Sequence, residues 1–105
     1  MSPSRIESLQ SILARDSKDA LARYMLANEL YKEGRYQEAI DSFMTYLGLK
    51  EDEGAAYRTM AEAYLQLGKV EEARTALEKG VAAALKYHHS GMAAEFEERL
   101  RELES

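Results

Sequence analysis

Two stretches of sequence decide the fold: LANELYKEGRYQEAIDSF at residues 26–43 and MAEAYLQLGKVEEARTAL at residues 60–77. They align at a constant offset of 34 residues, with small residues on small ones, apolar on apolar, and Gly34 on Gly68. Apolar residues recur at three- and four-residue steps on both sides of each glycine, which is the period of an amphipathic helix. A glycine is also typical of the residue just past a helix end, where the backbone is often left-handed. Each stretch therefore predicts a helix, a tight turn and a second helix.

This repeated unit resembles the tetratricopeptide repeat family, whose pattern reads W-x-x-L-G-x-x-Y, then A-x-x-x-F, then P. Residues that match the pattern in the first copy (20–53) are Leu26, Ala27, Leu30, Ala39 and Phe43. Residues that match it in the second copy (54–87) are Tyr57, Met60, Ala61, Tyr64, Ala73 and Leu77. The departures from the pattern are Arg23 in place of Trp, and Glu51 and Leu85 in place of Pro. The resemblance implies an all-α fold, a short right-handed αα-superhelix of about six antiparallel helices.

The flanks of the two repeats predict further helices. Residues 4–16 resemble the second helix of a repeat, and Ser4 with Glu7 has the spacing of a capping box. The helix beginning near residue 70 is expected to run on to about residue 87, because no proline ends it. Residues 90–104 predict a C-terminal capping helix with one apolar stripe, formed by Met92, Phe96, Leu100 and Leu103. We interpret residues 1–105 as a single domain of this repeat type.

The composition and the charge of the chain exclude several classes of partner. The chain has 105 residues, no cysteine and a net charge of −5, and residues 51–105 carry the whole acidic excess. An acidic chain repels phosphate backbones and anionic lipid, so we expect neither nucleic acid nor membrane as a partner. No apolar run approaches the ~20 residues that cross a bilayer, and no basic-then-apolar stretch opens the chain. The expected location is therefore the cytoplasm.

The resemblance implies that partners bind the inner face of the repeats, which the first helix of each repeat lines. The residues of that face that we propose as partner-binding are Leu21, Tyr24, Asn28, Tyr31, Lys32, Arg58, Glu62 and Leu65. Tyr24, Asn28 and Tyr31 share one side of a helix. A tyrosine pair offers contact area and an amide can bond a peptide backbone, while the alternative is that both rings only cover the terminal helices. Arg58 can bond a partner carboxylate.

Two more specific functions, a clamp for a chaperone C-terminus and an enzyme, are not favoured by the sequence. Some family members clamp a chaperone carboxylate through Lys and Asn, but Tyr24 stands at a clamp Lys position and Glu62 at an Asn position. Catalysis needs a nucleophile beside a base in a sheltered pocket, and the only histidines are the adjacent His88 and His89. We place both in the last turn of a helix, where positive charge suits the helix dipole. The sequence thus predicts no enzyme, no metal site and no cofactor.

The expected function is a non-enzymatic protein–protein interaction module, or adaptor, that binds a peptide or protein segment on the concave face. The alternative is a self-associating structural or assembly protein in which the terminal helices mediate homo-oligomerisation, for example as a homodimer. The apolar stripe of residues 90–104 separates the two predictions. If it packs on the preceding helix the groove is open, and if it crosses into a neighbour it is an oligomer interface.

Overall fold

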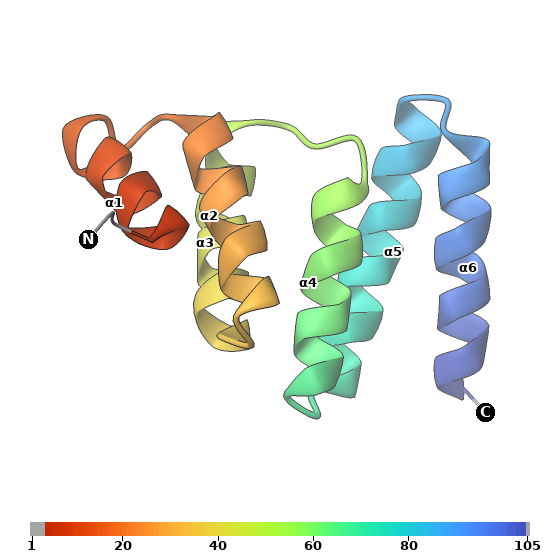
Figure 1. Cartoon of the computed structure of the whole chain (residues 1–105). Coiled ribbons are helices and arrows are strands. Elements are labelled where there is room, and N and C mark those ends of the chain that lie inside the picture. The colour runs from red at the N-terminus through yellow and green to blue at the C-terminus, as the bar shows by residue number, and fades with distance from the viewer. Residues whose placement is uncertain (1–3, 105) are drawn as a thin grey trace. The chain divides into compact units, whose positions relative to one another are not determined.

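The structure, a computed structural model, describes residues 4–104. The regular secondary structure of this range is entirely helical (Figure 1). Its helices are α1 (Arg5–Arg15), α2 (Ala20–Lys32), α3 (Tyr36–Leu49), α4 (Ala55–Gln66), α5 (Val70–Lys86) and α6 (Ser90–Glu104). This confirms the predicted all-α repeat fold. The chain divides into two compact units, one ending at Glu51 and one beginning at Asp52, and each is described by itself. The single domain over 1–105 and its internal repeat boundaries stay a prediction.

The first unit contains α1, α2 and α3, and its two leading helices begin at capped residues. Ser4 Oγ accepts a hydrogen bond from Glu7 N at 3.1 Å, and an Asp19 carboxylate oxygen accepts one from Ala22 N at 2.9 Å. Each bond satisfies a backbone donor that the first helical turn leaves free. Buried residues that form one core cluster of α1, α2 and α3 are Ile6, Leu9, Leu13, Ala22, Leu26, Leu30 and Ala39. The spacing of the α1 residues therefore places one face of that helix on α2.

The connections within the helix pairs repeat one geometry. Gly34 and Gly68, which follow α2 and α4, have φ angles of 76° and 74°. In both turns the amide after the glycine donates to a carbonyl five residues earlier, at 2.9 Å. This is the hydrogen bond that closes a helix end with a left-handed residue, which glycine adopts without a steric cost. The sequence-based assignment of these glycines to helix ends is confirmed.

The same geometry occurs a third time, at a turn that contains no glycine. His88 has a φ of 62°, and the His89 amide donates to the Ala84 carbonyl at 2.7 Å. Because α5 already ends at Lys86, the two histidines lie in the turn between α5 and α6. Their predicted place in the last helical turn is therefore wrong. The helix stops because the residue after Tyr87 turns left-handed, not because a proline or glycine interrupts it.

The second unit contains α4, α5 and α6. Asp52 fixes the start of α4, since one carboxylate oxygen accepts hydrogen bonds from Gly54 N at 2.8 Å and Ala56 N at 3.0 Å. Small residues let α4 and α5 approach closely, because a methyl group does not prop two backbones apart. Alanines of these two helices that are fully buried are Ala56, Ala61, Ala63, Ala73 and Ala84.

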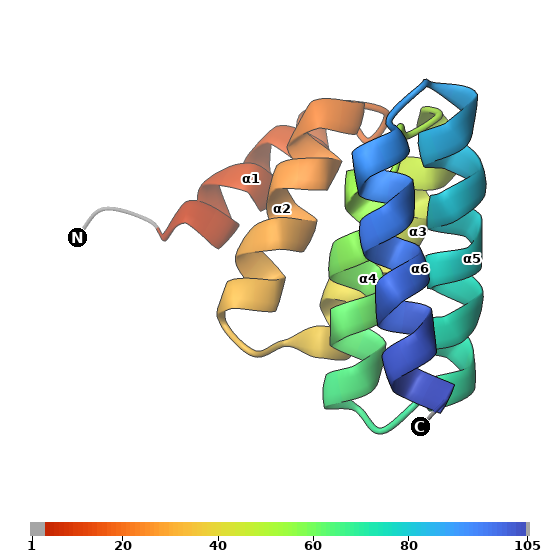
Figure 2. The same ribbon diagram turned by 90° about the vertical axis from the view of Figure 1, so that its right-hand side faces the viewer.

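The last helix, α6, packs against α5 in the same unit, and Figure 2 shows it running in front of α4 and α5. Phe96 anchors it, with a side chain only 1% exposed. Its ring lies over Gly80 of α5, where even a methyl group would come within 2.8 Å of it. The other members of the predicted stripe, Met92, Leu100 and Leu103, are half-buried. The centre of the stripe thus packs on the preceding helix of its own chain.

Candidate interaction groove between α4 and α6

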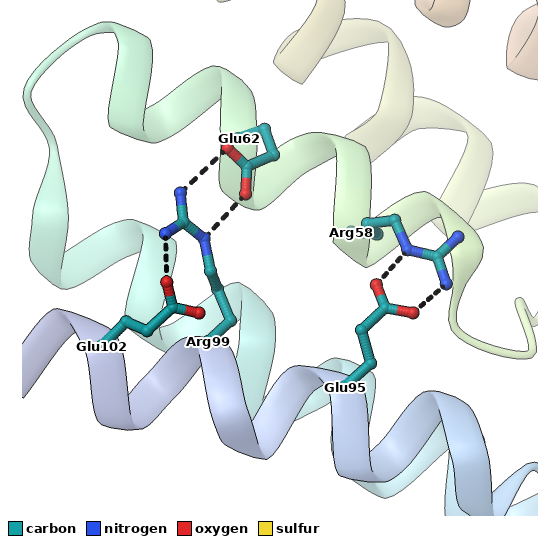
Figure 3. A network of polar contacts seen from close by, with 5 residues as sticks. All are labelled: Arg58, Glu62, Glu95, Arg99 and Glu102. Atoms are coloured by element: carbon teal, nitrogen blue, oxygen red, sulfur yellow. Dashed lines mark hydrogen bonds and ion pairs between the residues drawn. The ribbon is translucent and has the colours of Figure 1, made fainter.

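Two charged residues of α4 project toward α6 in the second unit. Arg58 and Glu62 are four residues apart, so they lie on one side of the helix. Opposite them, α6 carries Glu95 and Arg99 at the same spacing and in the reverse order of charge (Figure 3). Each side chain on α4 therefore faces one of opposite sign.

The first of these contacts joins Arg58 to Glu95. Arg58 Nε donates to Glu95 Oε2 at 2.6 Å, and Arg58 Nη2 donates to Glu95 Oε1 at 2.8 Å. The same guanidinium lies 5.5 Å from the centroid of the Phe96 ring, within the range of a cation–π contact. Hydrogen bonding from Arg58 holds the pKa of the Glu95 carboxyl below its usual value, although partial desolvation opposes this.

The second contact centres on Arg99, which serves two carboxylates. Its Nε and Nη2 donate to the two oxygens of Glu62 at 3.0 Å and 3.2 Å, and its Nη1 reaches Glu102 Oε2 at 3.4 Å (Figure 3). Hydrogen bonding to Glu62 raises the pKa of the Arg99 guanidinium above its usual value. Two-pronged pairs of this kind fix orientation as well as distance. The two contacts therefore set how α6 lies against α4.

Between these residues is a cavity of about 220 Å³. The residues that line it are Arg58, Glu62, Leu77, Glu95, Phe96, Glu98, Arg99 and Glu102. Leu77 and Phe96 are almost fully buried, whereas the six charged residues are partly or largely exposed. We call this cavity, with its lining residues, the α4–α6 groove. It has an apolar base and a charged rim.

The structure brings two of the eight predicted partner-binding residues, Arg58 and Glu62, into this groove. Both are engaged within the chain, so a partner that used them would compete with Glu95 and Arg99. Leu65 is half-buried on α4 and does not line the groove.

The remaining five predicted residues lie on α2 of the first unit, and three of them contribute to its packing. The Tyr24 ring lies 5.9 Å from that of Phe43 and 5.0 Å from that of Tyr46, both on α3. Asn28 Nδ2 donates to the Tyr24 carbonyl at 3.1 Å, and the Tyr31 ring lies 5.5 Å from that of Tyr36. We therefore expect replacement of these side chains to lower the stability of the fold, whatever they do for a partner.

The other two residues of α2 are exposed. Leu21 is 68% exposed, which makes it the most exposed of the large apolar side chains among residues 4–104. Lys32 forms an ion pair with Glu29 at 3.4 Å, and Arg5 of α1 reaches the same carboxylate at 3.0 Å. Leu21 and Lys32 are thus the members of this set that a partner reaches most easily.

Sequence reasoning missed the α6 side of the groove, namely Glu95, Glu98, Arg99 and Glu102. The three glutamates lie on the charged face of the predicted capping helix, opposite its apolar stripe, and Arg99 was not singled out. A signal was nevertheless present: residues 58 and 95, and residues 62 and 99, are each separated by 37 positions and carry opposite charge. Two such matches at one separation indicate that two helices lie side by side in register.

The two adjacent histidines are each placed away from a shared metal-binding position. His89 Nε2 lies 2.7 Å from Glu53 Oε1, whereas Glu95 is paired with Arg58. Within residues 4–104 no group of three or more His, Cys, Asp or Glu side chains is placed to hold a metal ion. Nor does any helix in that range have the length and apolar character needed to span a membrane.

Antiparallel helix pairs closed by left-handed turns at a 34-residue spacing define a helical repeat protein of the tetratricopeptide type. A family model described as anaphase-promoting complex, cyclosome, subunit 3 matches residues 6–80, which is more than half of the chain. The chain belongs to the family of tetratricopeptide-like repeats that this model describes. None of the curated proteins compared with the chain matches it.

Solved structures share the fold. PcrH, in complex with the chaperone binding region of PopD, is 23% identical with a TM-score of 0.85, over 93% of this chain and 74% of that one. Protein BPP2914 from Bordetella parapertussis is 22% identical with a TM-score of 0.82, over 97% of this chain and 89% of that one. MamA AMB-1 is 32% identical with a TM-score of 0.72, over 77% of this chain. The chain spans about half of the MamA length, 48%.

Proposed function

We propose that this protein is a non-enzymatic interaction module that binds a peptide or protein segment of a partner. The observation that carries the proposal is the α4–α6 groove, with its apolar base of Leu77 and Phe96 and its charged rim. On α2, the exposed Leu21 and Lys32 are the proposed additional contacts.

The size and the chemistry of the groove support a protein segment as its occupant. Its volume of about 220 Å³ is below the ~300–1,000 Å³ of typical small-molecule pockets, and it suits one or two side chains of a longer segment. Arg58 pairs with Glu95 and Arg99 with Glu62, which holds these four side chains in their charged forms as ion pairs and favours a binding role over acid–base catalysis. PcrH, which has a similar fold, was solved with a segment of another protein bound.

Site-specific photo-crosslinking tests this proposal. A photoreactive phenylalanine analogue replaces Glu98, which lines the groove, or Glu78, an exposed residue of α5 that does not line it. Each variant is irradiated in a lysate of the cells that make the protein, and mass spectrometry identifies the partner and the linked segment. We expect one segment to be linked from position 98 and not from position 78.

The outcomes separate the proposal from its alternative. Equal linking from both positions, or none, would contradict binding in the groove. Links only between copies of the chain itself would favour the self-associating alternative. That alternative stays a prediction, although Phe96, at the centre of the α6 stripe, packs on Gly80 of its own unit.

A further inference from the structure

We propose that the segment bound in the α4–α6 groove is basic, with Lys or Arg side chains next to an apolar side chain. This inference rests on the proposed function and names the chemistry of the partner. The apolar side chain would lie on Leu77 and Phe96, and the basic groups would meet the carboxylates of the rim.

The charges of the groove favour a cation over an anion. Four glutamates and two arginines line it, so the lining has a formal charge of −2 (+2 from Arg58 and Arg99, −4 from the glutamates). Glu98 is also paired with Arg101, which lies outside the lining, at 2.5 Å. Counting Arg101 still leaves a charge of −1. An incoming cation is therefore attracted.

The ion pairs of the two arginines also favour a basic partner over an acidic one. Arg58 binds both oxygens of Glu95, and Arg99 binds both oxygens of Glu62 while also reaching Glu102. A partner carboxylate would have to displace one of these intramolecular carboxylates to reach a guanidinium. A partner Lys or Arg can instead approach Glu98 or Glu102, and each carboxylate oxygen accepts more than one hydrogen bond.

The surroundings of the groove reinforce this preference. From Asp52 to the C-terminus the sequence has 11 acidic and 7 basic residues, a net charge of −4. Such a field attracts basic segments and raises their rate of association, most strongly at low salt. Partners with acidic segments are repelled both by the groove and by the unit around it.

The experiment uses the full chain and three amidated ten-residue peptides. In each peptide a central leucine is flanked by two lysines, two glutamines or two glutamates, and the rest is glycine and serine. Each peptide is titrated into isotopically labelled protein, and the NMR shifts of backbone amides give both the affinity and the location. We expect shifts confined to α4, α5 and α6 around the lining residues, with the lysine peptide binding roughly two- to tenfold more tightly than the glutamine peptide. The glutamate peptide is expected to bind most weakly.

A pair of double variants separates the groove from the general charge of the unit. Glu98→Gln/Glu102→Gln removes two rim carboxylates and leaves the Arg58–Glu95 and Arg99–Glu62 pairs in place. Glu72→Gln/Glu78→Gln removes the same charge from exposed positions of α5 that do not line the groove. Circular dichroism and the melting temperature verify that both variants fold. The first is expected to lose the advantage of the lysine peptide, and the second to keep most of it.

Three results would overturn the inference: tightest binding of the glutamate peptide, equal weakening by the two double variants, or absence of shifts at the groove. The photo-crosslinking experiment stands apart from this one. An acidic segment linked from position 98 would refute the basic partner and leave the proposed function intact. No segment linked from that position would refute the proposed function itself.

Discussion

Replacing Gly80 with alanine tests how α6 is held on the second unit. Gly80 is buried within α5, at the point where the Phe96 ring lies against the helix. A Cβ atom there would lie 2.8 Å from both Cδ2 and Cε2 of Phe96 and 3.1 Å from the Cβ of Tyr57. Real Cβ atoms essentially never make contacts as short as 2.8 Å, so the ring would have to move.

Two effects of opposite sign decide the magnitude. Alanine is favoured over glycine in a helix interior by about 0.8–1.0 kcal/mol. Overpacking a well-filled site costs about 1–3 kcal/mol. Since Phe96 is only 1% exposed and the added Cβ would also crowd the Cβ of Tyr57, we expect the packing cost to win. The net loss of unfolding free energy should reach up to about 2 kcal/mol.

Urea-induced unfolding measures this loss, with Gly91→Ala as the matched control in the same unit. A Cβ at Gly91, in the first turn of α6, meets nothing within 4 Å, so that variant should be as stable as the wild type or slightly more stable. Phe96→Leu shortens the side chain that causes the clash. The double variant Gly80→Ala/Phe96→Leu should therefore lose less than the sum of the two single losses. If Gly80→Ala matches Gly91→Ala, or if the losses add, the packing argument is wrong.

Three further predictions concern other parts of the fold. Phe43→Ala should lower the unfolding free energy by about 3–5 kcal/mol, because the ring is 0% exposed. Thermal unfolding measures this change, and a decrease of the unfolding free energy by less than about 2 kcal/mol would contradict the place of Phe43 in the core. Glu95→Gln should cost about 0.2–1 kcal/mol at neutral pH. The pKa of Glu95 in the folded state lies below the ordinary 4.5, so the stability that its charge contributes is full above pH 4.5 and is lost as the pH falls through the lowered pKa. In that acidic range the unfolding free energy of the variant, measured by denaturation, should depend less on pH than that of the wild type. His88→Gly should raise the unfolding free energy by up to about 1 kcal/mol, since glycine adopts the φ of 62° without strain, whereas a decrease would show that the histidine side chain stabilises the turn.

The helices and their turns could be predicted from sequence because their signals are local. The 34-residue spacing, the capping box at Ser4 and the left-handed turns at Gly34 and Gly68 all depend on residues within one or two helical turns. The end of α5 was predicted to within a residue, but His88 and His89 were wrongly placed in its last turn, because His88 adopts a left-handed conformation that its residue type disfavours. No local rule identifies such a residue when the surrounding packing determines its backbone.

The groove could be predicted only in part. Arg58 and Glu62 were assigned to an interaction face, but as groups open to a partner. Their pairing with Glu95 and Arg99 depends on how α6 lies against α4, 37 residues further along the chain. Tyr24 of α2 is a second case: it was assigned to the same interaction face, but its ring packs on Phe43 and Tyr46 of α3, a contact that the helical period of α2 does not predict.

The sequence alone determined the repeat family and the all-α fold, because periodicity, small residues and glycine positions act over short separations. The tertiary structure alone decided which charged residues face each other and where an apolar base lies beneath them. Whether a half-exposed side chain meets water or another side chain depends on the packing of helices distant in sequence. The spacing of apolar residues along one helix does not predict which of these two environments the side chain has.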